Sequence, residues 1–270
     1  MVVSAAHGDR RDERHAVAAR TSRPDAVVWH ELECGSYTAD LALWRELAAR
    51  AGTGTGAQPV LDVGAGSGRV SLDLAARGHR VTALDRDAEL LRALRERPGA
   101  AAIETVCADA RALDLPRRDF SVCLVPMQTI QLFGPADDRL AFLRGARAHL
   151  RRGGLLACAI VTDVESFDCA CGDVAPEPDS ALVDGIRYLS RPTRVLVSAQ
   201  TVRIERERTA FHPAHSDTPL LREHDVVQLA RLTATQLLRE GAAAGLTPAG
   251  TLEIPATEEH VASEVVLLHA

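Results

Sequence analysis

The stretch from Pro59 to Leu74 constrains the fold of this chain most strongly, because a strand, a glycine turn and a helix follow one another in it without a gap. Its first part, Pro59-Val-Leu-Asp-Val63, is apolar enough for a parallel strand that is covered on both faces. Three alternating glycines, Gly64, Gly66 and Gly68, then permit a tight turn and the close approach of a ligand to the backbone. The following helix directs its free N–H groups to the same place. The pattern predicts a nucleoside-cofactor site in an α/β fold.

The spacing of the glycines and of two acidic residues downstream narrows the choice of cofactor. A dinucleotide fingerprint, Gly-x-Gly-x-x-Gly, would place its last glycine where this chain has Arg69, and the Gly-Lys-Ser/Thr sequence of a P-loop does not occur. A second apolar strand ends in Asp85, whose carboxylate could accept hydrogen bonds from both hydroxyls of a ribose. Asp109 follows the next apolar run, where it could receive the amino group of an adenine. These positions favour an adenosine-type cofactor.

These motifs, in this order, resemble the core of the class I S-adenosylmethionine-dependent methyltransferases over residues 59–162. The resemblance implies an α/β fold with a doubly wound, Rossmann-like sheet of seven strands, in which the last strand enters antiparallel to the others. It also implies S-adenosylmethionine as the cofactor and methyl transfer as the reaction.

The same resemblance assigns the cofactor-binding residues to the glycine turn and to the tips of the second, third and fourth strands. They are Asp62, Gly64, Ala65, Gly66, Asp85, Arg86, Asp109, Ala110, Pro126, Gln128 and Gln131. In this assignment the glycines line the methionine and ribose, and Asp85 holds the ribose. Arg86 flanks the adenine, and Asp109 with the Ala110 backbone holds its edge. Asp62 would brace the turn or meet the amino group of the cofactor, and both roles stay open.

Outside this core the sequence divides into four further parts. We expect a disordered tail over residues 1–25, a helical N-terminal lid over 26–50, an antiparallel β insertion over 163–223 and the rest of the core sheet over 224–270, with the cofactor-binding core at 51–162. Apolar and charged residues alternate in Thr201-Val-Arg-Ile-Glu-Arg-Glu-Arg208, which predicts a strand with one wet face. Shorter strands are expected at 186–190 and 194–198. The insertion leaves the carboxyl end of the fifth strand, so it would face the acceptor or form an oligomer contact.

Local signals predict several helix ends. Thr38 or Asp40 could cap the lid helix, and Gly153 and Gly154 are expected to stop the helix that precedes the fifth strand. Thr233-Ala-Thr-Gln236 has the form of a capping box at the start of the last helix.

Composition limits the partners and the setting. The net charge of −6, without a basic stripe, argues against nucleic acid, as does Val125-Pro-Met-Gln128 where adenine-methylating DNA enzymes resemble one another in an Asn-Pro-Pro-aromatic motif. No apolar run is long enough for a membrane span, and the charged N-terminus is unlike a signal peptide. Three of the six cysteines lie in expected strands, which favours a reducing cytoplasm. Cys169-x-Cys171 lacks the spacing of a zinc site, so we expect no metal.

Methyl transfer depends first on positioning, and only some acceptors need a base. Candidates for catalytic residues lie in the lid, namely His30, Glu33 and Tyr37. The expected acceptor is a small organic molecule such as a natural-product intermediate, and O-, N- and C-methylation stay open, as does a homodimer. Two alternatives are a non-methylating reaction on the same fold, such as a cyclisation, and a noncatalytic cofactor-binding subunit.

Overall fold

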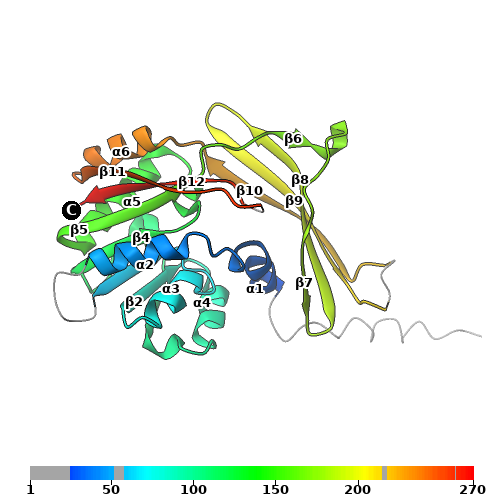
Figure 1. Ribbon diagram of the computed structural model, residues 1–270, viewed down its shortest axis with the longest axis horizontal. Helices are drawn as coiled ribbons and strands as arrows, with labels where there is room; N and C mark the ends of the chain where they lie inside the picture. The colour runs from blue at the N-terminus through cyan, green and yellow to red at the C-terminus, as the bar shows by residue number, and fades with distance from the viewer. Residues whose placement is uncertain (1–24, 52–57, 215–217, 259) are drawn as a thin grey trace, which may run out of the picture.

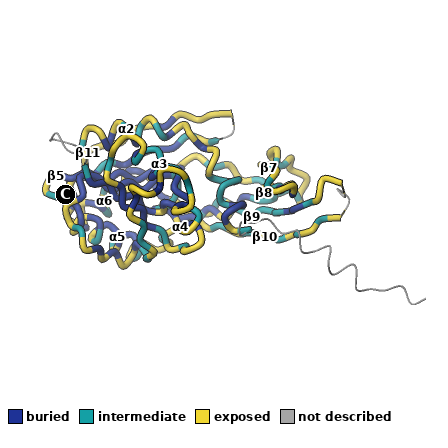
Figure 2. The backbone as a smooth tube through the Cα atoms, turned by 90° about the horizontal axis from the view of Figure 1, so that it is seen from below, coloured by how far each residue is buried: buried dark blue, intermediate teal, exposed yellow. Residues whose placement is uncertain are grey.

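The computed structural model describes residues 25–51, 58–214, 218–258 and 260–270, which form a large α/β body and a separate antiparallel sheet (Figure 1). The tail expected over residues 1–25 lies outside the described residues except for Asp25. Figure 2 shows that most buried segments gather in the α/β body, whereas the antiparallel sheet is largely half-buried and exposed. Among the described residues, no helix is both long and apolar enough to cross a bilayer.

The large sheet has seven strands in the order β11-β12-β5-β4-β1-β2-β3. Their bounds are β1 Pro59–Val63, β2 Arg80–Asp85, β3 Ile103–Cys107, β4 Phe120–Val125, β5 Leu150–Ile160, β11 Thr247–Ile254 and β12 Ser263–His269. Neighbours from β3 to β5 pair in parallel, and β12 pairs antiparallel with both β5 and β11. The doubly wound sheet with an antiparallel final strand is therefore confirmed.

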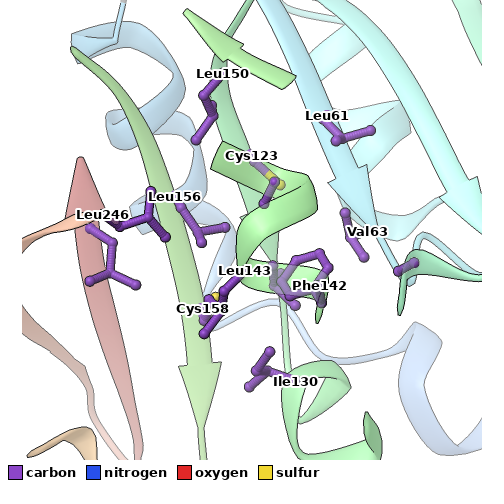
Figure 3. Close-up of a cluster of buried hydrophobic side chains, with 14 of the residues drawn as sticks. Leu61, Val63, Cys123, Ile130, Phe142, Leu143, Leu150, Leu156, Cys158 and Leu246 are labelled. Atoms are coloured by element: carbon purple, nitrogen blue, oxygen red, sulfur yellow. The ribbon is translucent and has the colours of Figure 1, made fainter. Parts of the chain in front are cut away.

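Helices cover both faces of this sheet. Their bounds are α2 Leu41–Arg50, α3 Arg69–Ala75, α4 Ala88–Arg95, α5 Ala136–His149 and α6 Ala234–Ala243, with short 3-10 turns η3 Ala100–Ala102, η4 Ala110–Ala112 and η5 Thr129–Phe133. Two apolar clusters result, because alternate strand residues face opposite sides. One cluster contains Leu61, Cys123 and Phe142 and is drawn in Figure 3. The other contains Val60, Trp44 and Leu94.

The buried thiols of the sheet behave as apolar groups. Cys123 and Cys158 are fully buried in the cluster shown in Figure 3. Burial raises the pKa of both thiols, so they stay protonated. All six cysteines are free, but Cys107, which ends β3, is exposed, so only Cys123 and Cys158 of the three cysteines expected in strands are buried.

The start of β5 differs from the expectation. Helix α5 ends at His149, and Leu150 already pairs with Phe120 of β4, so the glycine stop expected at Gly153 and Gly154 is wrong. The reason is a tertiary contact. The Gly153 N–H donates to the carbonyl of Ala270 at 2.8 Å, and the Ala270 N–H donates to the carbonyl of Gly154 at 3.0 Å. The chain end holds both glycines inside the sheet.

His149 at the end of α5 joins the helix to the loop before β4. Its Nδ1 lies 2.7 Å from the carbonyl of Gly145, and its Nε2 accepts the Leu115 N–H at 2.9 Å. Replacing His149 with leucine would leave that buried N–H unpaired. We expect the free energy of unfolding to fall by about 1–3 kcal/mol. Urea denaturation measures this, with His224→Leu on an exposed position as the control, and equal stability of the two variants would contradict the assignment.

The antiparallel sheet has the order β10-β9-β8-β6, and β7 pairs with β8. Its bounds are β6 Phe167–Asp168, β7 Asp179–Val183, β8 Ile186–Val197, β9 Thr201–Phe211 and β10 Leu221–Ala230, and the turn η6 Cys169–Cys171 follows β6. The strands expected at 186–190 and 194–198 are one strand, β8, with an irregularity between Pro192 and Arg194. The sheet also continues past residue 223, because β10 pairs along its whole length with β9.

The N-terminal lid consists of α1 Asp25–His30, a π-helical turn η2 Glu31–Gly35 and α2. Helix α1 lies between the α/β body and the antiparallel sheet (Figure 1). Asp40 occupies the N-cap position of α2 but makes no capping bond with its side chain, so the expected cap is wrong. Its carboxylate instead accepts hydrogen bonds from Trp44 Nε1 at 2.7 Å and from the guanidinium of Arg69. The half-buried Arg69 on α3 therefore takes the carboxylate away from the helix start.

Candidate functional site

The glycine loop after β1 lies against the end of β2. The N–H groups of Gly64 and Ala65 both donate to the carbonyl of Leu84, at 2.8 and 3.1 Å. Gly64 has a φ of +73°, and a β-carbon there would lie 2.6 Å from Thr129. Glycine is required at this position for both the backbone conformation and the space.

Asp85 is fixed beside this loop at the tip of β2. Its Oδ2 accepts the Gly66 N–H at 2.8 Å, and its Oδ1 accepts the Asp87 N–H at 2.9 Å. Each carboxylate oxygen has a further lone pair, so both can accept a hydroxyl as well. The arrangement fits a ribose diol lying across the loop.

Asp62 lies beneath the loop and is almost fully buried. Its Oδ2 accepts the Ser71 hydroxyl at 2.6 Å, whereas its Oδ1 is buried without a hydrogen-bond partner among the described residues. Burial raises the pKa of Asp62 to about 6. An unpaired buried carboxylate oxygen is costly unless a partner binds there. The α-ammonium group of S-adenosylmethionine is a partner of the right charge, so the residues present fit this cofactor.

The expected adenine contacts lie at the tips of β2 and β3. Asp109 accepts the Arg111 N–H at 2.9 Å and pairs with the Arg111 guanidinium at 2.6 Å, and these bonds lower the pKa of Asp109 to about 2. Ala110 is buried at the start of η4, and Arg86 is exposed directly after Asp85. Arg111 is a partner of Asp109 that the motifs in the sequence do not reveal. Its spacing two residues after the acid is the only local signal.

The tip of β4 carries an unusual backbone. Met127 has a φ of +54°, which costs a non-glycine residue about 1–2 kcal/mol. Such conformations cluster at ligand sites. Pro126 precedes Met127, and its carbonyl accepts the Thr129 hydroxyl at 3.0 Å. Gln128 is half-buried and stands just before η5.

Both the nitrogen and the oxygen of the Gln131 side-chain amide form hydrogen bonds within the protein. Its Nε2 donates to the carbonyls of Val161 and Ala230, at 3.1 and 3.0 Å, and its Oε1 accepts the Val161 N–H at 2.9 Å. Val161 follows β5 and Ala230 ends β10, so one side chain joins the two ends of the insertion. This use differs from the cofactor contact that the resemblance implies.

Two of the three lid candidates are held by other side chains, Tyr37 by ring packing and Glu33 by hydrogen bonds. Tyr37 is buried, with the guanidinium carbon of Arg69 5.2 Å from its ring centroid and the His260 ring centroid 4.6 Å away. Burial raises the pKa of Tyr37. Glu33 accepts the Ser190 hydroxyl at 2.6 Å and two N–H groups of Arg208 at 2.8 Å each.

The third candidate, His30, lies on the glycine loop. A β-carbon at Gly66 would overlap its Nε2 atom. Of the three lid residues, the structure therefore brings His30 to the loop that the sequence assigns to the cofactor, whereas Glu33 faces the antiparallel sheet. Burial raises the pKa of Glu33, but the hydrogen bonds from Arg208 and Ser190 outweigh it and hold the pKa below its usual value, which makes Glu33 a weak base.

A charged band crosses the face of the antiparallel sheet that contacts the lid. It consists of Glu33 from the lid and of Arg206, Arg208, Glu223 and Asp225 from β9 and β10. Arg208 lies 3.6 Å from Glu223 and 3.2 Å from Asp225. The band contains three carboxylates and two guanidinium groups.

Apolar clusters lie on both sides of the charged band. Trp29, Tyr188 and Ala210 pack at one end, and Val195, Val202 and Leu229 pack at the other. Arg208 itself lies 5.7 Å from the centroid of the Trp29 ring. A band of charge between apolar surfaces can hold an acceptor with an apolar frame and a charged group. The alternation in β9 is visible in the sequence, whereas the pairing of Arg208 with Glu33 is not, because Glu33 lies far away in the chain.

No group of three or more histidine, cysteine, aspartate or glutamate side chains able to hold a metal occurs in the part of the chain that the structure describes.

Comparisons with known proteins agree with this geometry. Residues 60–154 match the family model described as "Methyltransferase domain". A curated relative, the cypemycin N-terminal methyltransferase of a Streptomyces species, is 31% identical over 159 residues, which make up 57% of this chain and 63% of that protein. The match therefore spans slightly less than two thirds of the relative.

Solved structures share the fold over nearly the whole chain. CalS10, an amino pentose methyltransferase from Micromonospora echinaspora bound to S-adenosylmethionine, covers 99% of this chain and is covered over 99% of its own, with 17% identity and a TM-score of 0.65. The sugar N-methyltransferase KedS8 from a Streptoalloteichus species covers 98% of this chain and is covered over 97%, with 17% identity and a TM-score of 0.68. At these identities the matches establish the fold.

Proposed function

We propose that this chain, whose residues 60–154 match a methyltransferase domain, is a class I S-adenosylmethionine-dependent methyltransferase that transfers a methyl group to an amine nitrogen of a small natural-product intermediate. The matched domain and the glycine loop support S-adenosylmethionine as the cofactor. The names of these three similar proteins refer to the N-terminus of cypemycin, an amino pentose and a sugar nitrogen, which favours an amine as the acceptor. In this chain, the observation that supports an amine acceptor is the charged band on the antiparallel sheet.

The cofactor side of the proposal rests on Asp62, Asp85 and the glycine loop. Asp85 would accept the ribose hydroxyls, and the unpaired Oδ1 of Asp62 would accept the α-ammonium group. When bound, S-adenosylmethionine supplies the methyl group as an electrophile. The chain itself contributes positioning, because an acceptor atom held about 3–3.5 Å from the methyl carbon needs little further activation.

The acceptor side rests on the two carboxylates of β10. An amine arrives at neutral pH as a cation, which Glu223 and Asp225 attract. Asp225 Oδ2 is buried without a hydrogen-bond partner among the described residues, so it can accept an ammonium N–H. Before transfer the amine must release a proton, and a carboxylate that already bonds to that N–H is placed to take it. Arg208 keeps the band from becoming strongly anionic, which leaves one site for one positive charge.

Turnover with a panel of acceptors tests this function. Amino sugars and short peptides with a free N-terminus should gain one CH2 in the presence of S-adenosylmethionine, whereas the matching hydroxyl compounds should not. A product without added mass would favour a cyclisation on the same fold. Cofactor binding without any product across the panel would favour a noncatalytic subunit.

Turnover should not depend on a divalent metal, because the described residues offer no cluster of metal ligands. We expect rates with excess EDTA to equal those with added magnesium. Loss of turnover in EDTA that magnesium restores would reveal a metal site, and a cofactor-affinity measurement under both conditions would locate it on the cofactor or the acceptor side.

The raised pKa of Asp62 predicts a pH dependence of cofactor binding. Because an α-ammonium group prefers an ionised partner, affinity for S-adenosylhomocysteine should fall about tenfold as the pH drops from about 7 to about 5. Asp62→Asn should bind more weakly and lack this step. Calorimetric titration at a series of pH values measures both, and parallel profiles for the two proteins would contradict the role of Asp62.

The stability of the cofactor-free protein should increase, rather than decrease, as the pH is lowered. Burial raises the pKa of Asp62, so its protonated form favours the folded state below the ordinary pKa of 3.8, and this contribution is lost as the pH rises through about 6. Thermal melting of wild type and of Asp62→Asn over this pH range shows whether the pH dependence of stability comes from the Asp62 carboxyl.

The setting proposed for this reaction is the reducing cytoplasm, which the free thiols of all six cysteines support.

A further inference from the structure

His30, the last residue of α1, covers the second glycine of the loop. A β-carbon at Gly66 would overlap the His30 Nε2 atom and would lie 2.6 Å from Cε1. The N–H of the same glycine donates to Asp85 Oδ2 at 2.8 Å. The imidazole, the glycine backbone and the Asp85 carboxylate therefore form one corner of the loop.

The two neighbours of the imidazole in the sequence hold it in place. Glu31 pairs with Arg97, which follows α4 on the α/β body. On the other side, Trp29 packs edge-on against Tyr188 of the antiparallel sheet, with ring centroids 4.9 Å apart. The position of His30 over the loop is thus set by contacts to both bodies of the protein.

The surroundings of His30 favour its neutral imidazole. Burial lowers the pKa of His30, and the carboxylates around it, Asp85, Glu31, Glu33 and Asp87, only partly oppose the shift. A neutral imidazole offers one N–H donor and one lone pair. Both are suited to a hydroxyl group, which can donate and accept.

We propose that His30 is a cofactor-binding residue whose imidazole hydrogen-bonds a ribose hydroxyl of S-adenosylmethionine next to Asp85. This role replaces that of a base for the acceptor, because the ring lies on the loop that binds the cofactor, whereas the charged band lies on the sheet. The proposal rests on the assignment of the cofactor to this loop. It makes the lid a part of the cofactor site.

Calorimetry with modified cofactor products tests the contact atom by atom. We compare S-adenosylhomocysteine with its 2′-deoxy and 3′-deoxy forms in wild type, His30→Ala and His30→Gln. Removing the hydroxyl that His30 contacts should weaken binding about five- to tenfold more in wild type than in His30→Ala. His30→Gln, which places an amide at the reach of Nε2, should recover part of the difference.

A lid that only packs over the cofactor gives a different result. His30→Ala would then weaken all three compounds by the same factor, and this outcome would overturn the proposal. His224→Ala, an exposed histidine on β10, is the matched control, and melting temperatures show whether each variant is folded. If wild type itself bound none of the compounds, the cofactor assignment would fail first. If wild type bound them and His30→Ala matched it throughout, only the role of His30 would fail.

Discussion

Replacing Asp85 with alanine should weaken the binding of S-adenosylhomocysteine by about 100-fold or more, because two hydrogen bonds to a charged group are lost and each contributes about 1.5–3 kcal/mol. The structure adds a second reason. Asp85 also accepts the N–H groups of Gly66 and Asp87, so its removal loosens the loop itself. Calorimetry on the purified variant gives the affinity directly.

Two controls separate these reasons. Asp85→Asn keeps an acceptor for one backbone N–H and should bind more weakly than wild type but more tightly than Asp85→Ala. Asp109→Asn changes an acid that is already paired with Arg111, so it should have the smaller effect. Unchanged affinity in a folded Asp85→Ala protein would overturn the assignment of the ribose site.

Removing the antiparallel sheet should abolish turnover and leave cofactor affinity within about tenfold of wild type, a loss equivalent to about 1.4 kcal/mol. A short linker in place of residues 163–229 keeps Val161 and Ala230, whose carbonyls share the Nε2 of Gln131. The two ends of the removed segment therefore lie side by side, and the core sheet is not cut. The charged band is lost in this variant, so an amine has no partner.

Point variants cover the case in which the shortened chain does not fold. Asp225→Asn combined with Glu223→Gln removes two carboxylates that face the lid and should raise the KM for an amine acceptor at least about tenfold, without changing the affinity for S-adenosylhomocysteine. Arg222→Gln, on the opposite and exposed side of β10, is the control. Normal turnover in both the shortened chain and the double variant would show that the acceptor binds elsewhere, and the sheet would then be better explained as an oligomer contact.

The core of the fold was predictable because its signals are local. The apolar run of β1 ends at Val63, where the sequence places it, and the expected tight turn between β1 and α3 forms with positive φ angles at its glycines. The capping box at Thr233 and Gln236 forms as expected, with both reciprocal bonds. Each of these features depends on residues within one turn or one strand of each other.

The differences arise where a distant residue decides the outcome. Gly153 and Gly154 lie in β5 because the chain terminus pairs with them, and Asp40 leaves the helix cap because Arg69 takes its carboxylate. The resemblance assigns Gln131 to the cofactor, yet its amide bonds to Val161 after β5 and to Ala230 at the end of β10. No sequence window contains these partners together.

The candidate site divides in the same way. Gly64 and Asp85 follow from spacing, whereas the partner of Glu33 does not, because Arg208 comes from a strand of the insertion. The sequence places Glu33, Tyr37 and His30 in one lid. Only the folded chain separates them into an ion pair, a packed ring and a residue on the loop.

The single amide of Gln131 has a consequence for how such a protein can diversify. The Gln131 side chain bonds to both ends of the antiparallel sheet, so the segment between those ends is attached to the core at a single fixed point. A sheet of another length or surface could replace this segment without a change in the cofactor-binding residues. The protein could then acquire a new acceptor specificity by replacement of one segment, without changes in the core. The two partners of Gln131 define the ends of that segment.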